Sequence, residues 1–123
     1  MAKKILLIED EEILANMYKL KLVKAGYEVE VARDGETGVQ LTKSLKPDLV
    51  LLDIIMPKKD GFIVLEEIKS DEFTKNIPVY MLTNLGQEED TAKGKELGAV
   101  GYFVKADMTP GELVIKINKH FKK

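Results

Sequence analysis

A chain of 123 residues is within the usual size of one domain and is long enough to bury a core without disulfides. Hydrophobic residues make up 45% and charged residues 33%, a balance typical of a folded chain rather than a disordered one. The formal net charge of -2 gives no general attraction for nucleic acid or for an anionic membrane, and the absence of cysteine excludes zinc–thiolate sites. No apolar run is long enough to span a bilayer, so we expect a single domain over residues 1–123 and a cytoplasmic location.

The N-terminal segment predicts a buried strand followed by a helix. Residues 5–8 are a continuous apolar run, which is typical of a strand covered on both faces. Residues 11–25 then repeat apolar residues at helical spacing, and Gly26 is a plausible stop. The apolar side of this predicted helix carries Ile13, Met17 and Leu20.

Two further units of strand and helix follow in the middle of the chain. Residues 29–31 alternate apolar and polar side chains, as an edge strand does, and residues 36–45 read as a helix after a turn. Residues 48–52 are a second buried strand. The third predicted helix carries an apolar stripe of Phe62, Leu65 and Ile68.

The C-terminal part contains the last two units. Residues 78–82 and 100–104 are apolar strands, and between them residues 88–97 form a helix with few apolar side chains, which we expect to be comparatively mobile. Residues 109–112 match a capping box with proline at the first helical position, and the helix that follows has apolar residues at helical spacing. The five alternating units predict an α/β fold of three layers, with a five-stranded parallel sheet between helices.

Polar residues follow four of the predicted strands, where open parallel sheets form their ligand sites. These residues are Glu9, Asp10, Glu11, Asp53, Thr83, Asn84 and Lys105. Crowded carboxylates raise one another's pKa unless a cation intervenes, and hard oxygen ligands of this kind suit Mg²⁺. Together with an amine and a hydroxyl, such a set has the parts needed to neutralise a phosphoryl group during its transfer to a carboxylate.

The order of these motifs resembles one known family over the whole chain. The resemblance rests on Leu7–Glu11, Leu52–Pro57, Asp60-Gly61, Thr83 and Tyr102–Lys105. The chain is similar to the receiver domain of bacterial two-component response regulators, especially the stand-alone chemotaxis type. This resemblance implies a flavodoxin-like doubly wound fold with strand order 2-1-3-4-5, and a phosphoaccepting signalling switch that modifies only itself rather than an enzyme with turnover.

The resemblance also assigns a phosphoacceptor and a metal site. Asp53 matches the family's phosphoacceptor, and Glu9 and Asp10 match its acidic pair. Mg²⁺ would be held by Asp10 directly, by Glu9 through water, by Asp53, and by the backbone carbonyl of Ile55.

Three more positions match the machinery of the switch. Thr83 matches the switch hydroxyl, Lys105 the lysine that pairs with the phosphate, and Tyr102 the aromatic residue that rotates. Ala106 departs from the family, because a proline with a cis bond usually follows this lysine. We therefore expect either a trans peptide with an altered loop or a strained cis bond, since cis costs about 3 kcal/mol at a residue other than proline.

By the same resemblance, the phosphodonor is a histidine kinase or a histidine phosphotransfer protein. The output would pass through the helix at 88–97, the strand at 100–104 and the last helix to an unknown protein target. We expect no direct binding to nucleic acid and no membrane contact.

Several other readings of the same residues stay open. Glu9, Asp10 and Glu11 also suit the start of any helix, where they favour its positive end. A Mg²⁺-dependent phosphohydrolase is a second alternative, and such an enzyme often needs a second acid close after the nucleophile, here Asp53, to protonate the leaving group. A flavin carrier would want a glycine-rich phosphate loop after the first strand. A receiver that is never phosphorylated and serves only for docking is the fourth alternative.

Overall fold

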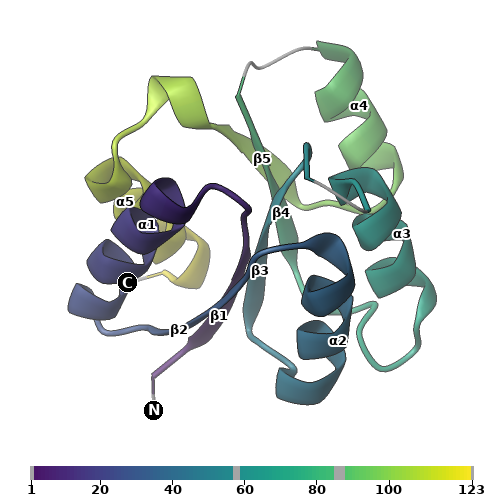
Figure 1. Cartoon of the computed structure of the whole chain (residues 1–123), viewed down its shortest axis with the longest axis horizontal. Helices are drawn as coiled ribbons and strands as arrows, with labels where there is room; N and C mark the ends of the chain where they lie inside the picture. The colour runs from purple at the N-terminus through teal and green to yellow at the C-terminus, as the bar shows by residue number, and fades with distance from the viewer. Residues whose placement is uncertain (1, 57–58, 85–87, 123) are drawn as a thin grey trace.

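The protein, seen in a computed structural model, contains a five-stranded parallel sheet between two layers of helices (Figure 1). The structure describes residues 2–56, 59–84 and 88–122. The strands are β1 (Lys4–Ile8), β2 (Glu28–Ala32), β3 (Leu49–Asp53), β4 (Val79–Thr83) and β5 (Gly101–Val104). Their order in the sheet is β2-β1-β3-β4-β5, and every neighbouring pair is parallel. The predicted fold class and strand order are confirmed.

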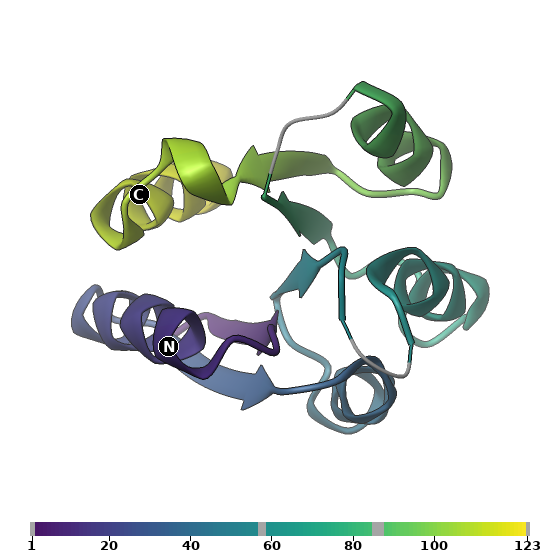
Figure 2. The same cartoon turned by 45° about the horizontal axis from the view of Figure 1, so that its top comes forward.

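Helices cover both faces of the sheet (Figure 2). The helices are α1 (Glu12–Lys24), α2 (Gly35–Leu45), α3 (Gly61–Ser70), α4 (Glu88–Glu96), α5 (Pro110–Phe121) and the short 3-10 helix η1 (Lys105–Asp107). α1 packs beside α5, whereas α2, α3 and α4 pack side by side on the opposite face. Among the described residues, no helix combines the length and the apolar character that crossing a bilayer requires.

The two central strands are buried on both faces and divide the hydrophobic core in two. Ile5 and Leu7 face α1 and α5, whereas Leu6 and Ile8 face the layer of α2 and α3. All four side chains are completely buried, as are the apolar residues of β3. Continuous apolar runs are therefore required here, which explains why the sequence predicted these strands well.

The buried face of α1 differs from the predicted one, and that prediction was wrong. Ile13, Met17 and Leu20 are 79%, 47% and 64% exposed. The helix instead packs through a second stripe of helical spacing, formed by Ala15, Tyr18 and Leu22. Because α1 carries apolar residues on both sides, periodicity alone does not choose between the two faces.

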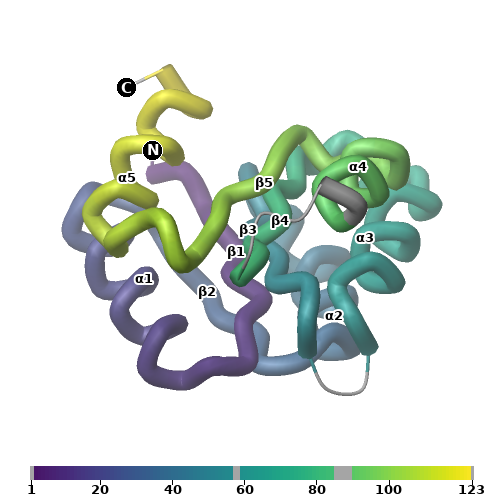
Figure 3. The backbone as a smooth tube through the Cα atoms, turned by 90° about the horizontal axis from the view of Figure 1, so that it is seen from above, coloured from purple at the N-terminus to yellow at the C-terminus, as the bar shows by residue number. Residues whose placement is uncertain are grey.

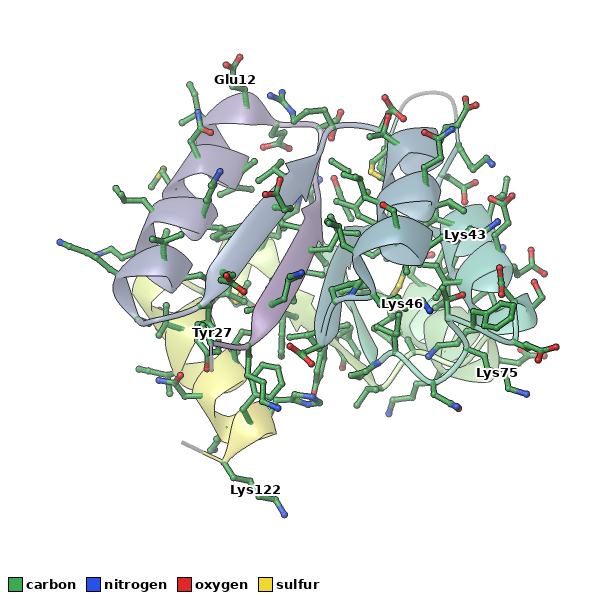
Figure 4. All side chains as sticks on the ribbon, turned by 90° about the horizontal axis from the view of Figure 1, so that it is seen from below. Glu12, Tyr27, Lys43, Lys46, Lys75 and Lys122 are labelled. Atoms are coloured by element: carbon green, nitrogen blue, oxygen red, sulfur yellow. The ribbon has the colours of Figure 1, made fainter. Side chains whose placement is uncertain are left out.

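An exposed apolar strip therefore runs along the solvent side of α1, and we call it the α1 stripe. It consists of Ile13, Met17, Leu20 and Val23. The helix begins at Glu12, at the carboxyl edge of the sheet, and ends shortly before Tyr27 (Figure 4).

The exposure of the α1 stripe makes a testable difference between two leucines of the same helix. We expect Leu20→Ala to change the free energy of unfolding by less than about 0.5 kcal/mol, because the side chain is already in water. Leu22→Ala should cost several times more, because Leu22 is fully buried in the core. Urea unfolding of both variants measures the difference. Equal losses would place Leu20 in the packed face, as the sequence pattern had suggested.

Side chains cap the starts of two helices, and one of these caps was predicted from the sequence. Asp34 caps α2 by accepting a hydrogen bond of 2.8 Å from the backbone N–H of Thr37. Thr109 and Glu112 form the predicted capping box of α5, in which each side chain accepts from the backbone N–H of the other residue. These caps fix where α2 and α5 begin, and so they fix the loops at the carboxyl edge of the sheet.

Candidate functional site

Three carboxylates meet at the carboxyl edge of the sheet, which lies toward the bottom of Figure 3, where β1 leads into α1. Glu9 and Asp10 follow β1, and Asp53 ends β3. β1 and β3 are neighbours, with Ile8 paired to Leu52, so the residues that follow are brought together. One carboxylate oxygen from each of the three acids lies within 4.8 Å of the others. Glu9 is 0% exposed and Asp53 is 3% exposed, so the cluster lies largely out of water.

Lys105 joins the cluster from the far end of the chain. Its Nζ lies 2.8 Å from Oε1 of Glu9, to which it donates a hydrogen bond, and 3.3 Å from Oδ2 of Asp53. Glu11, which is exposed, lies 3.9 Å from the same ammonium. The Lys105 side chain is 5% exposed, so these ion pairs are shielded from solvent.

Crowding and burial shift the pKa values of the acids and the lysine in this cluster. Burial raises the pKa of Asp53, the nearby Glu9 raises it further, and Lys105 only partly opposes them, so that it reaches about 8. Burial lowers the pKa of Lys105, but its hydrogen bond to Glu9 and the charge of Asp53 raise it by more. Burial also raises the pKa of the Tyr18 hydroxyl beside this cluster, to about 12. One ammonium therefore does not satisfy all the carboxylates, which is the condition under which such a site takes up a cation.

The donor set fits Mg²⁺. Three carboxylate oxygens lie within reach of one ion, and Mg²⁺ prefers hard oxygen ligands while it keeps several waters. Glu9, Asp10 and Asp53 are the residues predicted to hold it, and the structure brings them together. The contribution of the Ile55 carbonyl stays a prediction; the Ile55 side chain is 70% exposed beside the site.

Thr83 lies at the same edge, at the end of the strand next to β3. Asp53 pairs with Leu82 in the sheet, so Thr83 lies one residue further along the neighbouring strand. Thr83 is 5% exposed, so its side chain lies inside the molecule rather than in solvent.

Tyr102 lies on β5 and is 40% exposed. It borders a hollow of about 270 Å³ between β5, η1 and the middle of α5. The other residues that line the hollow are Phe103, Val104, Asp107, Met108 and Lys116. The ring is thus partly in solvent, with open space next to it.

The loop after Lys105 settles one of the two alternatives left by Ala106. The Lys105–Ala106 peptide bond is not cis. The chain forms η1 at this point, and the backbone N–H of Met108 contacts the carbonyl oxygen of Lys105 at 3.4 Å. Pro57, part of the motif after Asp53, lies outside the described residues.

Two residues that support the site were not recognised from the sequence. Arg33 donates a hydrogen bond of 2.6 Å from Nη2 to the backbone carbonyl of Asp10, and it is the only arginine in the chain. Gly61 was named only as part of the motif Asp60-Gly61, with no role of its own, yet its backbone N–H donates a hydrogen bond of 2.7 Å to the Ile54 carbonyl. Both residues contact backbone atoms, and every residue type has these atoms, so such contacts produce no recognisable sequence pattern. The scarcity of arginine was the one available signal for Arg33.

Comparison with known proteins gives a family match over most of the chain. The family model described as "Response regulator receiver domain" matches residues 5–118. The DNA-binding dual master transcriptional regulator RpaA of Synechocystis sp. is 43% identical over 102 residues, which cover 83% of this chain and 42% of that protein. The chain spans about half the length of the curated relatives it matches.

Solved structures of similar proteins agree with the fold over nearly the whole chain. The chemotaxis protein CheY4 of Vibrio cholerae has a TM-score of 0.90 and 29% identity, and the match covers 97% of this chain and 98% of that one. A chain of the CheX–CheY–BeF3–Mg complex of Borrelia burgdorferi has a TM-score of 0.87 and 29% identity, with 98% and 90% covered.

Proposed function

The chain belongs to the response regulator receiver domain family, and on that premise we propose that it works as a switch phosphorylated at Asp53. Receiver domains are the phosphoaccepting components of two-component signalling. The observation that carries the assignment to Asp53 is the buried ammonium of Lys105, which lies 3.3 Å from Asp53 and 2.8 Å from Glu9. A carboxylate nucleophile, two further acids for a cation and an amine for the phosphoryl oxygens thus share one pocket.

The proposed reaction is the transfer of a phosphoryl group from a phosphohistidine. A carboxylate oxygen of Asp53 attacks the phosphorus, the P–N bond of the donor breaks, and an acyl phosphate forms while the released imidazole takes up a proton. Glu9, Asp10 and Asp53 would hold Mg²⁺, whose positive charge would keep Asp53 ionised and neutralise the phosphoryl oxygens. Lys105 exchanges its contact with Asp53 for one with the transferred phosphoryl group.

We place the phosphodonor on a partner protein, a histidine kinase or a histidine phosphotransfer protein. His120, the only histidine of this chain, lies on α5 and its Nδ1 is 3.1 Å from the Tyr80 hydroxyl, so it is not positioned to phosphorylate Asp53. The α1 stripe begins beside the site and offers apolar surface to a protein donor rather than to a small molecule. A kinase partner has its ATP in the cytoplasm, where this proposal places the chain.

The output is proposed to follow from movement of Thr83. When Thr83 moves toward the phosphoryl group it vacates space, and Tyr102 turns inward from its half-exposed position. The surface formed by α4, β5 and α5 then changes and is read by a protein target. We propose no contact between this chain and nucleic acid. That residues 1–123 form one receiver domain stays a prediction.

Phosphorylation with a small acyl-phosphate donor tests the acceptor. In the presence of Mg²⁺ and acetyl phosphate, the wild-type chain should gain the mass of one phosphoryl group, and Asp53→Asn should gain none. The control Asp107→Asn, which alters an exposed acid two residues after Lys105, should be labelled like wild type. No Mg²⁺-dependent labelling of the wild type would favour the alternative of a docking domain that is never phosphorylated.

A further inference from the structure

Arg33 contacts the loop between β1 and α1 from the β2 side of the sheet. It directly follows Ala32, the last residue of β2, and Ala32 pairs with Ile8 at the end of β1. Its Nη2 donates a hydrogen bond of 2.6 Å to the backbone carbonyl of Asp10. The guanidinium thus links the end of one strand to a residue that carries one of the three clustered carboxylates.

The residues on either side of Asp10 are anchored by other contacts. The backbone N–H of Glu9 donates to the carbonyl of Ala32 at 2.9 Å. The N–H of Glu11 contacts the Glu9 carboxylate at 3.3 Å, and the Glu11 carbonyl accepts a hydrogen bond in the first turn of α1. Asp10 lies between these anchors, and Arg33 fixes its peptide unit. Fixing the backbone restricts where the Asp10 carboxylate can lie.

The charge of Arg33 and its hydrogen bond predict opposite effects on cation binding. A guanidinium that contacts the backbone of Asp10 repels a cation arriving at the cluster, so the charge alone would weaken Mg²⁺ binding. Arg33 is exposed, however, and water and salt screen its charge, whereas the hydrogen bond is a constraint on geometry. Lys105 differs in both respects, because it is buried and contacts the carboxylates themselves.

We propose that Arg33 is a positioning residue for Mg²⁺ binding, which holds the Asp10 carboxylate toward Glu9 and Asp53 through its hydrogen bond to the Asp10 carbonyl. The inference rests on the proposed function, since it requires that the three acids bind the cation. Arg33, which follows β2, would then support a Mg²⁺ site whose other residues come from the ends of β1 and β3 and from η1.

Direct titration of the unphosphorylated full chain with MgCl2 tests this role. Calorimetry or amide NMR would compare wild type with Arg33→Met, Arg33→Lys and the control Lys24→Met, which removes one exposed positive charge from the far end of α1. The loss of one such hydrogen bond should raise the Kd for Mg²⁺ about threefold to tenfold in Arg33→Met. Arg33→Lys should recover part of the affinity, and Lys24→Met should match wild type.

A second readout separates positioning from participation in the reaction. At saturating Mg²⁺, Arg33→Met should be labelled by acetyl phosphate at the wild-type rate, while the Mg²⁺ concentration for half of that rate rises with the Kd. An unchanged or lower Kd in Arg33→Met would overturn the inference, because a purely electrostatic role predicts tighter binding. The absence of saturable Mg²⁺ binding in the wild type would instead overturn the proposed function.

Discussion

Lys105→Met should lower the free energy of unfolding by about 3–5 kcal/mol at about pH 9 without Mg²⁺, because Asp53 is ionised there and the change removes the cation from a buried ion pair. The Glu9 carboxylate is fully buried, 2.8 Å from the Lys105 ammonium, and Asp53 is 3.3 Å from it. Methionine fills much of the space that the lysine stem occupies, so the loss reports uncompensated charge more than a cavity. Urea unfolding in metal-free buffer measures the effect.

The pH dependence of this loss has a defined sign. The pKa of Lys105 is raised above its ordinary 10.5, so its contribution is fully present at neutral pH and disappears only as the pH rises beyond that value. The pKa of Asp53 is about 8, so acidification below pH 8 protonates it and reduces the need for a cation. The difference between wild type and Lys105→Met should therefore shrink as the pH falls.

A second lysine provides the control for charge. The Lys69 ammonium donates to the backbone carbonyls of Lys75 and Ile77, at 3.0 and 2.7 Å, rather than to a carboxylate. Lys69→Met should therefore destabilise the chain by an amount that does not change between acidic and neutral pH, and added Mg²⁺ should not affect it. Added Mg²⁺ should reduce the loss of unfolding free energy in Lys105→Met, because the bound ion would neutralise the carboxylates in place of the lysine. A loss that grows toward acidic pH would contradict this account.

The sequence predicted the parts of the fold that are set by burial on both faces. Residues 5–8 and 48–52 were predicted as buried strands, because a continuous apolar run is typical of a strand covered on both faces of a parallel sheet. The apolar residues of both segments are 0% exposed. The face of α1 was mistaken because Ile13 and Leu20 form as good a stripe as Tyr18 and Leu22. Only the packing of the whole domain decides between the two.

In the site, too, the residues that form a side-chain pattern were predicted, whereas the residue that contacts the backbone was not. Glu9, Asp10, Asp53 and Lys105 were predicted to meet because each follows a strand of one parallel sheet, and the structure brings them together. Arg33 acts on a carbonyl group. Contacts to the backbone depend on where the chain passes, and residue types alone do not encode this.

Gly61→Ala should disrupt the site and the fold together, although it adds only one methyl group. A Cβ at this position would lie 2.3 Å from the carbonyl oxygen of Asp53 and 2.7 Å from Cα of Ile54. Both are backbone atoms, so neither can rotate away, and either the end of β3 or the start of α3 must shift. We expect a loss of at least about 2 kcal/mol in the free energy of unfolding. Because Asp53 is displaced, the Mg²⁺ affinity should fall as well.

Gly111→Ala is the matched control, because the chemical change is identical and the surroundings are open. Apart from its chain neighbours and the backbone of its own helix, the nearest atom to a Cβ at Gly111 is the Thr109 hydroxyl oxygen at 3.8 Å. Gly111 is the second residue of α5, and alanine is preferred to glycine in a helix. This variant should gain up to about 1 kcal/mol of stability and keep its Mg²⁺ affinity. Urea unfolding of the pair should give changes of opposite sign, and MgCl2 titration should show a loss of affinity in Gly61→Ala alone, if the close approach of α3 to β3 determines where Asp53 lies. A Gly61→Ala chain that is as stable as wild type and binds Mg²⁺ normally would show that β3 and α3 can separate without moving the acceptor.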